Sequence, residues 1–354
     1  MPHDIPRTTI RAIAERVGVS TTTVSLVLRH HPKISAATRE RVERVAKELG
    51  YRPDPELAKL MDRLRRARQP HFKSTIAALT NISEQEERPY HRELIAGSRD
   101  RADELGYRLE IFRFEHGASR DLALQRILRS RGVEGVLLLP LHAEPLTRLL
   151  DWRKFSVVAA TSGVLAPHFH RVVPHHFANT LLLCQNLARL GYRRLGLVVN
   201  REFDILITPG FSAAIVWQHA VGLMEPVAPL IHQGEEATEV CAWFERQRPD
   251  AIIARGFPDA EAIVRNLGLS FPGRIGLAIS NLEDSRTFAG IDGHAGKIGA
   301  AAIDLLNSKI VIGERGIPAT PMTGMIEGSW VHGPSVRRKK SAAIGSVDGG
   351  SMGA

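Results

Sequence analysis

The chain has 354 residues, 44% of them hydrophobic, with two cysteines and a formal net charge of +9. No apolar run reaches the ~18–20 residues of a membrane span and no secretory signal opens the chain, which excludes a membrane protein or a disulfide-stabilised secreted domain and predicts a soluble cytoplasmic protein. Residues 1–70 hold 15 Lys and Arg against 8 Asp and Glu, a net +7 that leaves +2 for the other 284 residues, so this part is expected to bind a polyanion.

The first fifty residues are predicted to form three short helices. Apolar spacing and capping residues place the first over residues 10–17, start the second after Ser20, and start the third after Ser35, ending it at Gly50. Two short helices separated by a glycine turn form a helix-turn-helix, whose second helix enters the major groove of DNA. The pattern therefore predicts an all-α DNA-binding headpiece.

Two groups of side chains in this headpiece are candidates for DNA contacts. Those that point outward from the second helix are the candidates for base contacts, namely Thr21, Thr22, Ser25, Leu26 and Arg29. Those at helix starts or in turns are the candidates for phosphate contacts, namely Thr9, Ser20, Thr23, Lys33, Ser35 and Thr38. The alternative is that the hydroxyls only cap the helices of a small bundle.

The residues that carry a family resemblance are A-I-A-E-R-V-G-V-S-T-T-T-V-S from Ala12, I-S-A-A-T-R-E-R-V from Ile34 and L-G-Y-R-P-D-P from Leu49. They resemble the headpiece of the LacI/GalR family of transcriptional regulators, which includes the lactose and purine repressors. The resemblance implies a homodimer that binds a near-palindromic operator as a repressor. Leu26 is apolar where the named relatives have a polar or charged residue, so the operator sequence is not carried over.

The predicted headpiece spans residues 1–52. The resemblance also implies a hinge helix that follows it. By position Leu60 matches the leucine that inserts into the minor groove, while Leu57 stands where the family usually has alanine. An amphipathic linker or a dimer contact is the alternative interpretation. The hinge and a basic linker together take residues 53–73, and the basic part either continues the helix, follows phosphates, or is only solvated.

Beyond the linker, short apolar runs alternate with helical patterns, which is typical of a parallel sheet covered by helices on both faces. The order resembles the family's two-lobed α/β sensor module, which has the fold of periplasmic binding proteins. We expect an N-lobe of residues 74–162 and 290–318 and a C-lobe of residues 163–289 and 319–333. Residues 334–354 become basic and then rich in Gly, Ser and Ala, which predicts a disordered tail.

In this architecture a small-molecule effector lies between the lobes, beyond the carboxyl ends of the strands. Candidate contacts at those positions are Tyr90, His91, Thr161, His175, Phe211, Gly256 and Asn281. The family's usual sugar-binding residues are missing: no arginine occurs in residues 204–209, Gly256-Phe257 replaces an Asn-Asp pair, and Ser280-Asn281 replaces an aspartate. The effector, a sugar or another metabolite, is therefore unusual, weakly bound, or lost.

Motifs for other functions are missing from the sequence. It has no Gly-rich nucleotide loop, no metal-ligand spacing among its 15 histidines, and no G-x-S-x-G nucleophile motif, so we expect neither a cofactor, nor a metal, nor an enzyme. Two alternatives to a specific regulator remain. One is a low-specificity DNA-binding protein with a vestigial sensor module, and the other is a small-molecule-binding protein of the sugar-binding class.

Overall fold

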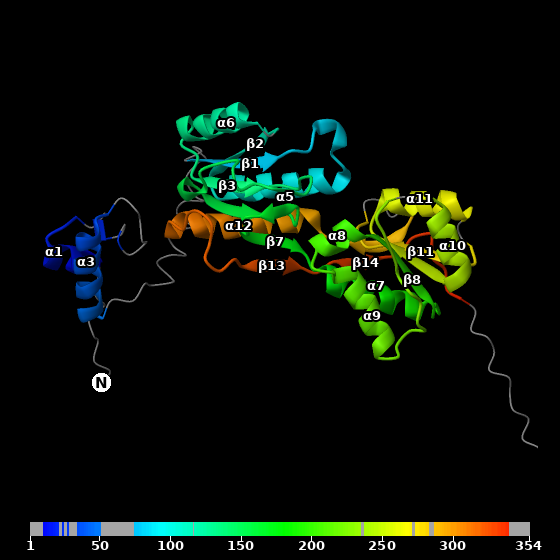
Figure 1. Cartoon of the computed structure of the whole chain (residues 1–354). Coiled ribbons are helices and arrows are strands. Elements are labelled where there is room, and N and C mark those ends of the chain that lie inside the picture. The colour runs from blue at the N-terminus through cyan, green and yellow to red at the C-terminus, as the bar shows by residue number, and fades with distance from the viewer. Residues whose placement is uncertain are drawn as a thin grey trace, which may run out of the picture. The chain divides into compact units, whose positions relative to one another are not determined.

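Figure 1 shows the computed structural model, in which the contacts divide the chain into two compact units. The first unit comprises Met1–Val173 and Ala295–Gly324, and the second comprises Pro174–His294 and Met325–Ala354. The structure describes residues 10–20, 23–24, 27, 34–50, 74–115, 117–234, 237–270, 273–282 and 287–339.

The headpiece contains the predicted first and third helices, α1 (Ile10–Val17) and α3 (Ala36–Glu48). Their apolar faces meet in one small core with two residues of the second helix, made up of Ile13, Ala14, Val17, Val24, Val27, Val42 and Ala46. The Arg41 guanidinium donates a 2.7 Å hydrogen bond to the carbonyl of Val17 and so ties the end of α1 to α3. Gly18 has a φ of +75°, a conformation that favours glycine, which ends α1 as predicted.

The first unit also contains a six-stranded sheet of order β13-β7-β5-β3-β1-β2. Its strands are β1 (Ser74–Thr80), β2 (Tyr107–Arg113), β3 (Gly135–Leu138), β5 (Ser156–Ala159), β7 (His170–Pro174) and β13 (Thr323–Ile326), and its helices are α5 (Pro89–Glu104), α6 (Ala118–Ser130) and α12 (Ala295–Ile312). A minor sheet pairs β4 (Glu144–Pro145) with β6 (Val164–Ala166), and two short 3₁₀ helices cover Glu84–Glu86 and Trp152–Lys154. Ala77 and Leu79 of β1 pack in the cluster that contains Leu128 of α6, whereas Ile76 faces Ile310 of α12 across Gly135. The helices therefore cover both faces of the sheet, as predicted.

Helices α5 and α12 lie side by side with their backbones in contact (Figure 1). A Cβ atom added to Gly97 of α5 would lie 2.2 Å from the carbonyl oxygen of Gly296, and one added to Gly299 would lie 2.2 Å from that of Leu94. Real Cβ atoms essentially never approach backbone this closely. Glycine at these positions is therefore what allows the two helices to pack.

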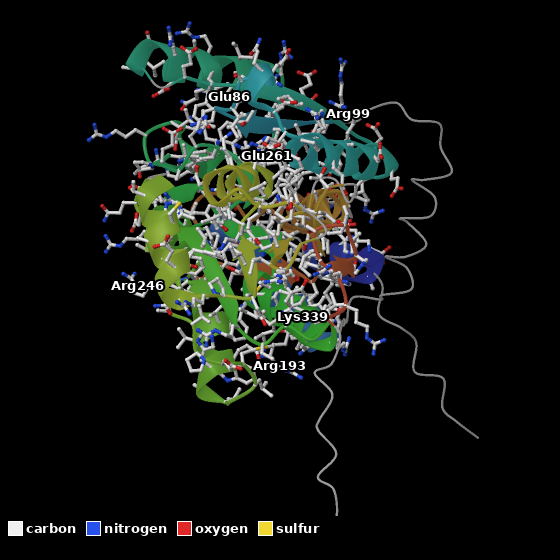
Figure 2. The ribbon with its side chains drawn as sticks, turned by 90° about the vertical axis from the view of Figure 1, so that its right-hand side faces the viewer. Glu86, Arg99, Arg193, Arg246, Glu261 and Lys339 are labelled. Carbon is white, nitrogen blue, oxygen red and sulfur yellow. The ribbon has the colours of Figure 1, made fainter. Side chains whose placement is uncertain are left out.

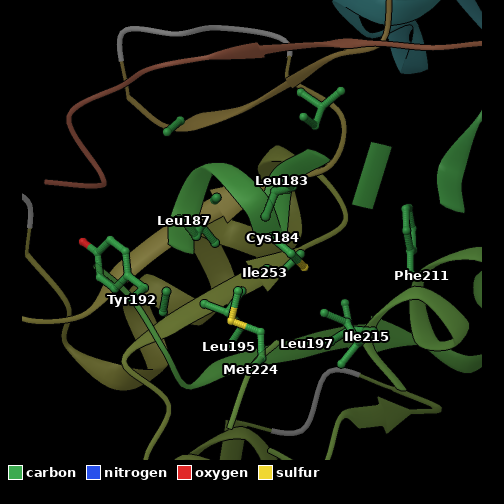
Figure 3. Packing of buried hydrophobic residues seen from close by; sticks show 14 of the residues in the cluster. Leu183, Cys184, Leu187, Tyr192, Leu195, Leu197, Phe211, Ile215, Met224 and Ile253 are labelled. Atoms are coloured by element: carbon green, nitrogen blue, oxygen red, sulfur yellow. The ribbon is translucent and has the colours of Figure 1, made fainter. Parts of the chain in front are cut away.

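The second unit is built on a six-stranded sheet of order β14-β12-β11-β10-β8-β9. Its strands are β8 (Leu195–Asn200), β9 (Leu230–His232), β10 (Ala251–Ala254), β11 (Gly276–Ile279), β12 (Ala289–Asp292) and β14 (Ser329–Val331), and its helices are α7 (His176–Arg189), α8 (Arg201–Leu206), α9 (Gly210–Ala220), α10 (Ala237–Gln247) and α11 (Phe257–Leu267). Figure 3 shows the core in which α7 and α9 pack on one face of this sheet. The strand residues whose side chains point to the other face of the sheet pack with α10 and α11 in a second core.

The unit boundaries differ from the predicted lobe limits at all three crossings. The first crossing is at residues 173–174 rather than 162–163, because β7 adds a further parallel strand beside β5, pairing His170 with Val158. The second is at residues 294–295 rather than 289–290, because β12 pairs with β11 in the second sheet. The third is at residues 324–325 rather than 318–319.

The predicted disordered tail begins too early, because residues 334–339 belong to the second unit. Ser335 and Val336 are buried, and the Ser335 hydroxyl donates to the carbonyl of Leu277 (2.6 Å) and accepts from the N–H of Ala289 (2.8 Å). Lys339 forms a 2.8 Å ion pair with Asp250, which also accepts the backbone N–H of Arg193, and Figure 2 shows Lys339 beside Arg193. The predicted tail beyond Lys339 lies outside the described residues.

Candidate DNA interface and ligand site

The serine–threonine pairs at two helix starts of the headpiece form the same capping arrangement. The N–H of Thr23 donates to the Ser20 hydroxyl (3.0 Å), and the N–H of Thr38 donates to the Ser35 hydroxyl (3.3 Å). In each pair the two hydroxyl oxygens are 2.9 Å apart. The predicted caps are therefore present, and Ser20 and Ser35 are exposed at helix N-termini, where the helix dipole favours a phosphate.

The remaining predicted DNA contacts lie outside the described residues. These are the predicted base contacts Thr21, Thr22, Ser25, Leu26 and Arg29, the predicted phosphate contacts Thr9 and Lys33, and the predicted hinge leucines Leu57 and Leu60. Their roles remain predictions.

The first unit has a small hollow at the carboxyl ends of β1 and β3, lined by Thr80, Ile82, Glu87, His91, Ile95, Leu139 and Pro140. His91 accepts the N–H of Arg88 at its Nδ1 (3.3 Å), which leaves the proton of the neutral ring on Nε2. Burial and the nearby Arg88 lower the pKa of His91, so the ring is neutral at physiological pH. His91 can therefore donate one hydrogen bond to a ligand.

Two other predicted ligand contacts belong to the first unit. Tyr90 is half-buried beside His91, with ring centroids 6.0 Å apart, and burial together with Glu93 raises the pKa of its hydroxyl, which stays protonated. Thr161 follows β5, and its hydroxyl accepts the N–H of Gly163 (2.9 Å), closing a turn. Tyr90 and His91 are thus neighbours at the start of α5, while Thr161 lies in the turn after β5.

In the second unit, His175 and Phe211 have structural contacts of their own. The His175 ring caps α7 by accepting the N–H of Ala178 (3.3 Å). Phe211 is only 2% exposed and packs on the rings of His176 and Phe203, with centroids 5.1 and 6.1 Å away. Phe211 is therefore a core residue of α9 in the described structure, and its predicted ligand contact remains a prediction.

Gly256 and Asn281 follow the carboxyl ends of β10 and β11. A Cβ atom on Gly256 would meet only the backbone oxygen of Asn281, at 3.9 Å, and one on Gly293 would lie 3.7 Å from the Asn281 amide oxygen. The three residues therefore lie together at the edge of the sheet where parallel α/β folds bind ligands.

Sequence reasoning missed Arg255, the residue before Gly256. Its guanidinium lies 4.7 Å from the ring centroid of Phe203 in α8 and forms an ion pair with Asp259 (2.9 Å). Helix α8 contains the first half of residues 204–209, where the family's arginine was expected and not found. A guanidinium therefore reaches this region from the end of β10, which only the tertiary contact reveals.

His176 is held neutral between two aromatic rings, and this predicts a pH-dependent stability. Burial, together with a smaller contribution from His175, lowers the pKa of His176 to about 4, from 6.5 in the unfolded chain. As the pH falls from 6.5 towards 4, only the unfolded chain takes up this proton, so the second unit should lose up to about 3 kcal/mol of unfolding free energy. Denaturant unfolding followed by tryptophan fluorescence at pH 6.5 and below should show this loss of unfolding free energy. A His176→Phe variant should not show the share of the loss that comes from His176. An identical dependence of stability on pH in the two proteins would contradict the assignment.

The described residues contain no group of three or more His, Cys, Asp or Glu side chains placed to hold a metal ion. Among them, no helix has both the length and the apolar character needed to cross a membrane.

Comparison with known proteins identifies the headpiece. Residues 9–54 match the family model for "Bacterial regulatory proteins, lacI family". Residues 9–54 are therefore similar to the DNA-binding headpiece of this family. Curated relatives include the transcriptional regulator CelR of Thermobifida fusca, 31% identical over 201 residues (55% of this chain, 56% of CelR), and the repressor PurR of Pectobacterium carotovorum, 28% identical over 193 residues (54% and 53%). The alignments thus span about half the length of these relatives, which are named as HTH-type transcriptional regulators.

Solved structures extend the likeness to the whole fold. A CelR–cellobiose complex matches with a TM-score of 0.57 at 22% identity, covering 93% of this chain and 100% of CelR. A Lac repressor dimer bound to operator and the anti-inducer ONPF matches with a TM-score of 0.54 at 19% identity, covering 93% and 99%. The predicted architecture, a helix-turn-helix headpiece with a two-lobed α/β module, is confirmed.

Proposed function

We propose that this chain is a sequence-specific transcriptional regulator of the lacI family, a repressor, that binds a near-palindromic operator as a homodimer in the cytoplasm. The observation that carries the proposal is the family match over residues 9–54, together with a headpiece whose helices share a closed apolar core. The Lac repressor neighbour is a dimer bound to its operator, which supports the same arrangement here. We assign the chain no catalytic role.

The DNA contacts proposed for this headpiece follow the helix-turn-helix geometry. The proposed base contacts are Thr21, Thr22, Ser25, Leu26 and Arg29, and the proposed phosphate contacts are Thr9, Ser20, Thr23, Lys33, Ser35 and Thr38. Leu57 and Leu60 of the hinge are proposed to enter the minor groove. The exposed caps Ser20 and Ser35 support the phosphate assignment, because their helix N-termini offer backbone N–H groups to an anion.

The effector is proposed to be a small molecule bound by residues at the strand ends of both units: Tyr90, His91, Thr161, His175, Phe211, Gly256 and Asn281. CelR is solved with cellobiose, which supports a small-molecule ligand for this fold. We add Arg255 to this set, because its guanidinium reaches the region where the family arginine is missing. Differential binding of the effector to two arrangements of the units would then bias the hinge between its folded and unfolded states.

Replacing Thr22 by alanine tests the base-reading role directly. We expect affinity for the preferred operator to fall about tenfold, with preference lost at one symmetric pair of base positions, because a mismatched contact costs about 1–3 kcal/mol. Thr38→Ala is the matched control, since a phosphate contact should weaken binding evenly on every duplex. The affinity of each variant protein for a library of single-base operator variants measures the two effects. An equal loss of affinity on every duplex for Thr22→Ala would show that Thr22 contacts a phosphate and not a base.

Salt dependence separates the proposal from a low-specificity DNA-binding protein with a vestigial sensor. A nonspecific binder loses affinity steeply with salt and shows little preference among duplexes, whereas a specific regulator keeps a preference of ~10³-fold or more at physiological salt. A protein of the sugar-binding class would bind a ligand and no DNA. Titrating the full chain against operator and scrambled duplexes at two salt concentrations therefore decides among the three.

A further inference from the structure

The end of α12 presents apolar side chains to solvent. Val311 and Ile312, in the last turn, are 41% and 43% exposed, and Ile317 in the following loop is 53% exposed. The turn is well formed, because the N–H of Gly313 donates to the carbonyl of Ile310 (3.2 Å). These three residues together form an exposed apolar surface, the α12-end surface.

This surface lies close to the point where the chain enters the first sheet. Asn307, one helical turn before Val311, accepts a 3.0 Å hydrogen bond from the hydroxyl of Tyr107. Tyr107 is the register partner of Ser74, the first residue of β1. Ser74, where the chain enters β1, therefore lies on the side of the first unit where α12 ends.

The sequence of that segment offers a complementary apolar stripe. Leu57, Leu60, Met61 and Leu64 are spaced i, i+3, i+4 and i+7, so in a helix they share one face. Pro70 disfavours helix at the residue before it, which leaves the last five residues before β1 to cross ~17 Å in extended form. That reach is enough to bring a helix that ends near residue 68 against the α12-end surface.

Charge favours the same contact. Residues 63–73 contain five basic residues and no acidic one. The last turn of α5 carries the exposed carboxylates of Asp103 and Glu104, and α12 carries that of Asp304, which is joined to Glu104 through Arg101. In a docked linker helix these arginines would face the carboxylates, of which Glu104 and Asp304 also pair with Arg101.

We propose that the α12-end surface is the docking site of the chain's own basic linker, with Met61 and Leu64 packing on Val311 and Ile312. Leu57 and Leu60 lie one turn earlier on the same face and are not part of the docked pair. The docked linker holds the C-terminal end of the hinge against the first unit. A movement of this unit therefore also moves the hinge. The contact forms without DNA, which allows it to be tested separately from operator binding.

Trypsin digestion of the full-length protein without DNA is the first test, because the linker arginines are cleaved only when the linker leaves its site. Val311→Asp/Ile312→Asp should accelerate cleavage at residues 63–68 roughly tenfold, since cleavage follows the population of the open form. Leu64→Asp should have the same effect, and combining it with the α12 changes should add little. Val216→Asp on α9, a residue 54% exposed, is the control and should leave the rate unchanged. Unchanged cleavage in both Val311→Asp/Ile312→Asp and Leu64→Asp would overturn the proposal.

A cysteine pair tests which chain supplies the linker. Leu64→Cys with Ile312→Cys, in a Cys241→Ser background, should form an intramolecular disulfide under mild oxidation, whereas Leu64→Cys with Val216→Cys should not. The buried Cys184 is left in place. A disulfide that joins two chains would contradict docking within one chain and assign the surface to a second copy.

Discussion

Replacing Gly97 by alanine is expected to lower the unfolding free energy of the first unit by at least about 3 kcal/mol. The added Cβ would lie 2.2 Å from the carbonyl oxygen of Gly296, and because its neighbours are backbone atoms, α5 and α12 must move apart to relieve the clash. Denaturant unfolding followed through Trp152, a buried residue of the same unit, measures the loss.

Gly117→Ala is the matched control for this substitution. Gly117 belongs to the same unit, but a Cβ there meets only the flexible side chain of Arg120, at 3.8 Å. We expect a smaller loss of about 1 kcal/mol, because Gly117 is the N-cap of α6 and alanine is a poorer N-cap than glycine. Equal losses in the two variants would show that the close packing of α5 and α12 is not what requires Gly97.

Ending the chain at Gly333 is expected to destabilise the second unit by about 4 kcal/mol or more, whereas ending it at Lys339 should have no measurable effect. The shorter chain loses the burial of Val336, the Ser335 hydrogen bonds to Leu277 and Ala289, and the ion pair of Lys339. A buried valine contributes ~1.5–3 kcal/mol and each hydrogen bond ~0.5–1.5 kcal/mol.

Thermal unfolding of the two truncated chains beside the full-length protein measures this difference. Lys339→Ala in the full-length protein isolates the ion pair, which is partly exposed and should contribute about 1 kcal/mol or less. If the chain ending at Gly333 were as stable as the chain ending at Lys339, residues 334–339 would be dispensable and the original expectation of a tail from residue 334 would stand.

Sequence patterns predicted the fold where local signals were strong. The caps at Ser20 and Ser35 and the stop at Gly18 follow from the preferences of single residues, and the structure contains all three. The apolar runs that became β1, β8 and β10 are buried on both faces, which is what makes such strands recognisable in a parallel sheet.

The features that sequence reasoning missed depend on contacts between distant residues. Strand β7 is five residues long and ends in Pro174, so only its pairing with β5 identifies it as part of the first sheet. Val336 lies two residues after Pro334 and directly before a basic run, which is typical of a tail, yet it is buried in the core beside Tyr192. Arg255 reaches Phe203 from 52 positions away, and no spacing rule predicts that contact.

The central proposal is that this chain reads a specific DNA sequence, and selection of bound duplexes from a random pool by the full-length protein tests it most directly. At near-physiological salt the account predicts enrichment of a palindromic site, with half-sites about one helical turn apart centre to centre. Measurable binding without enrichment of any sequence, with and without a metabolite mixture, would contradict it and leave a low-specificity DNA-binding protein.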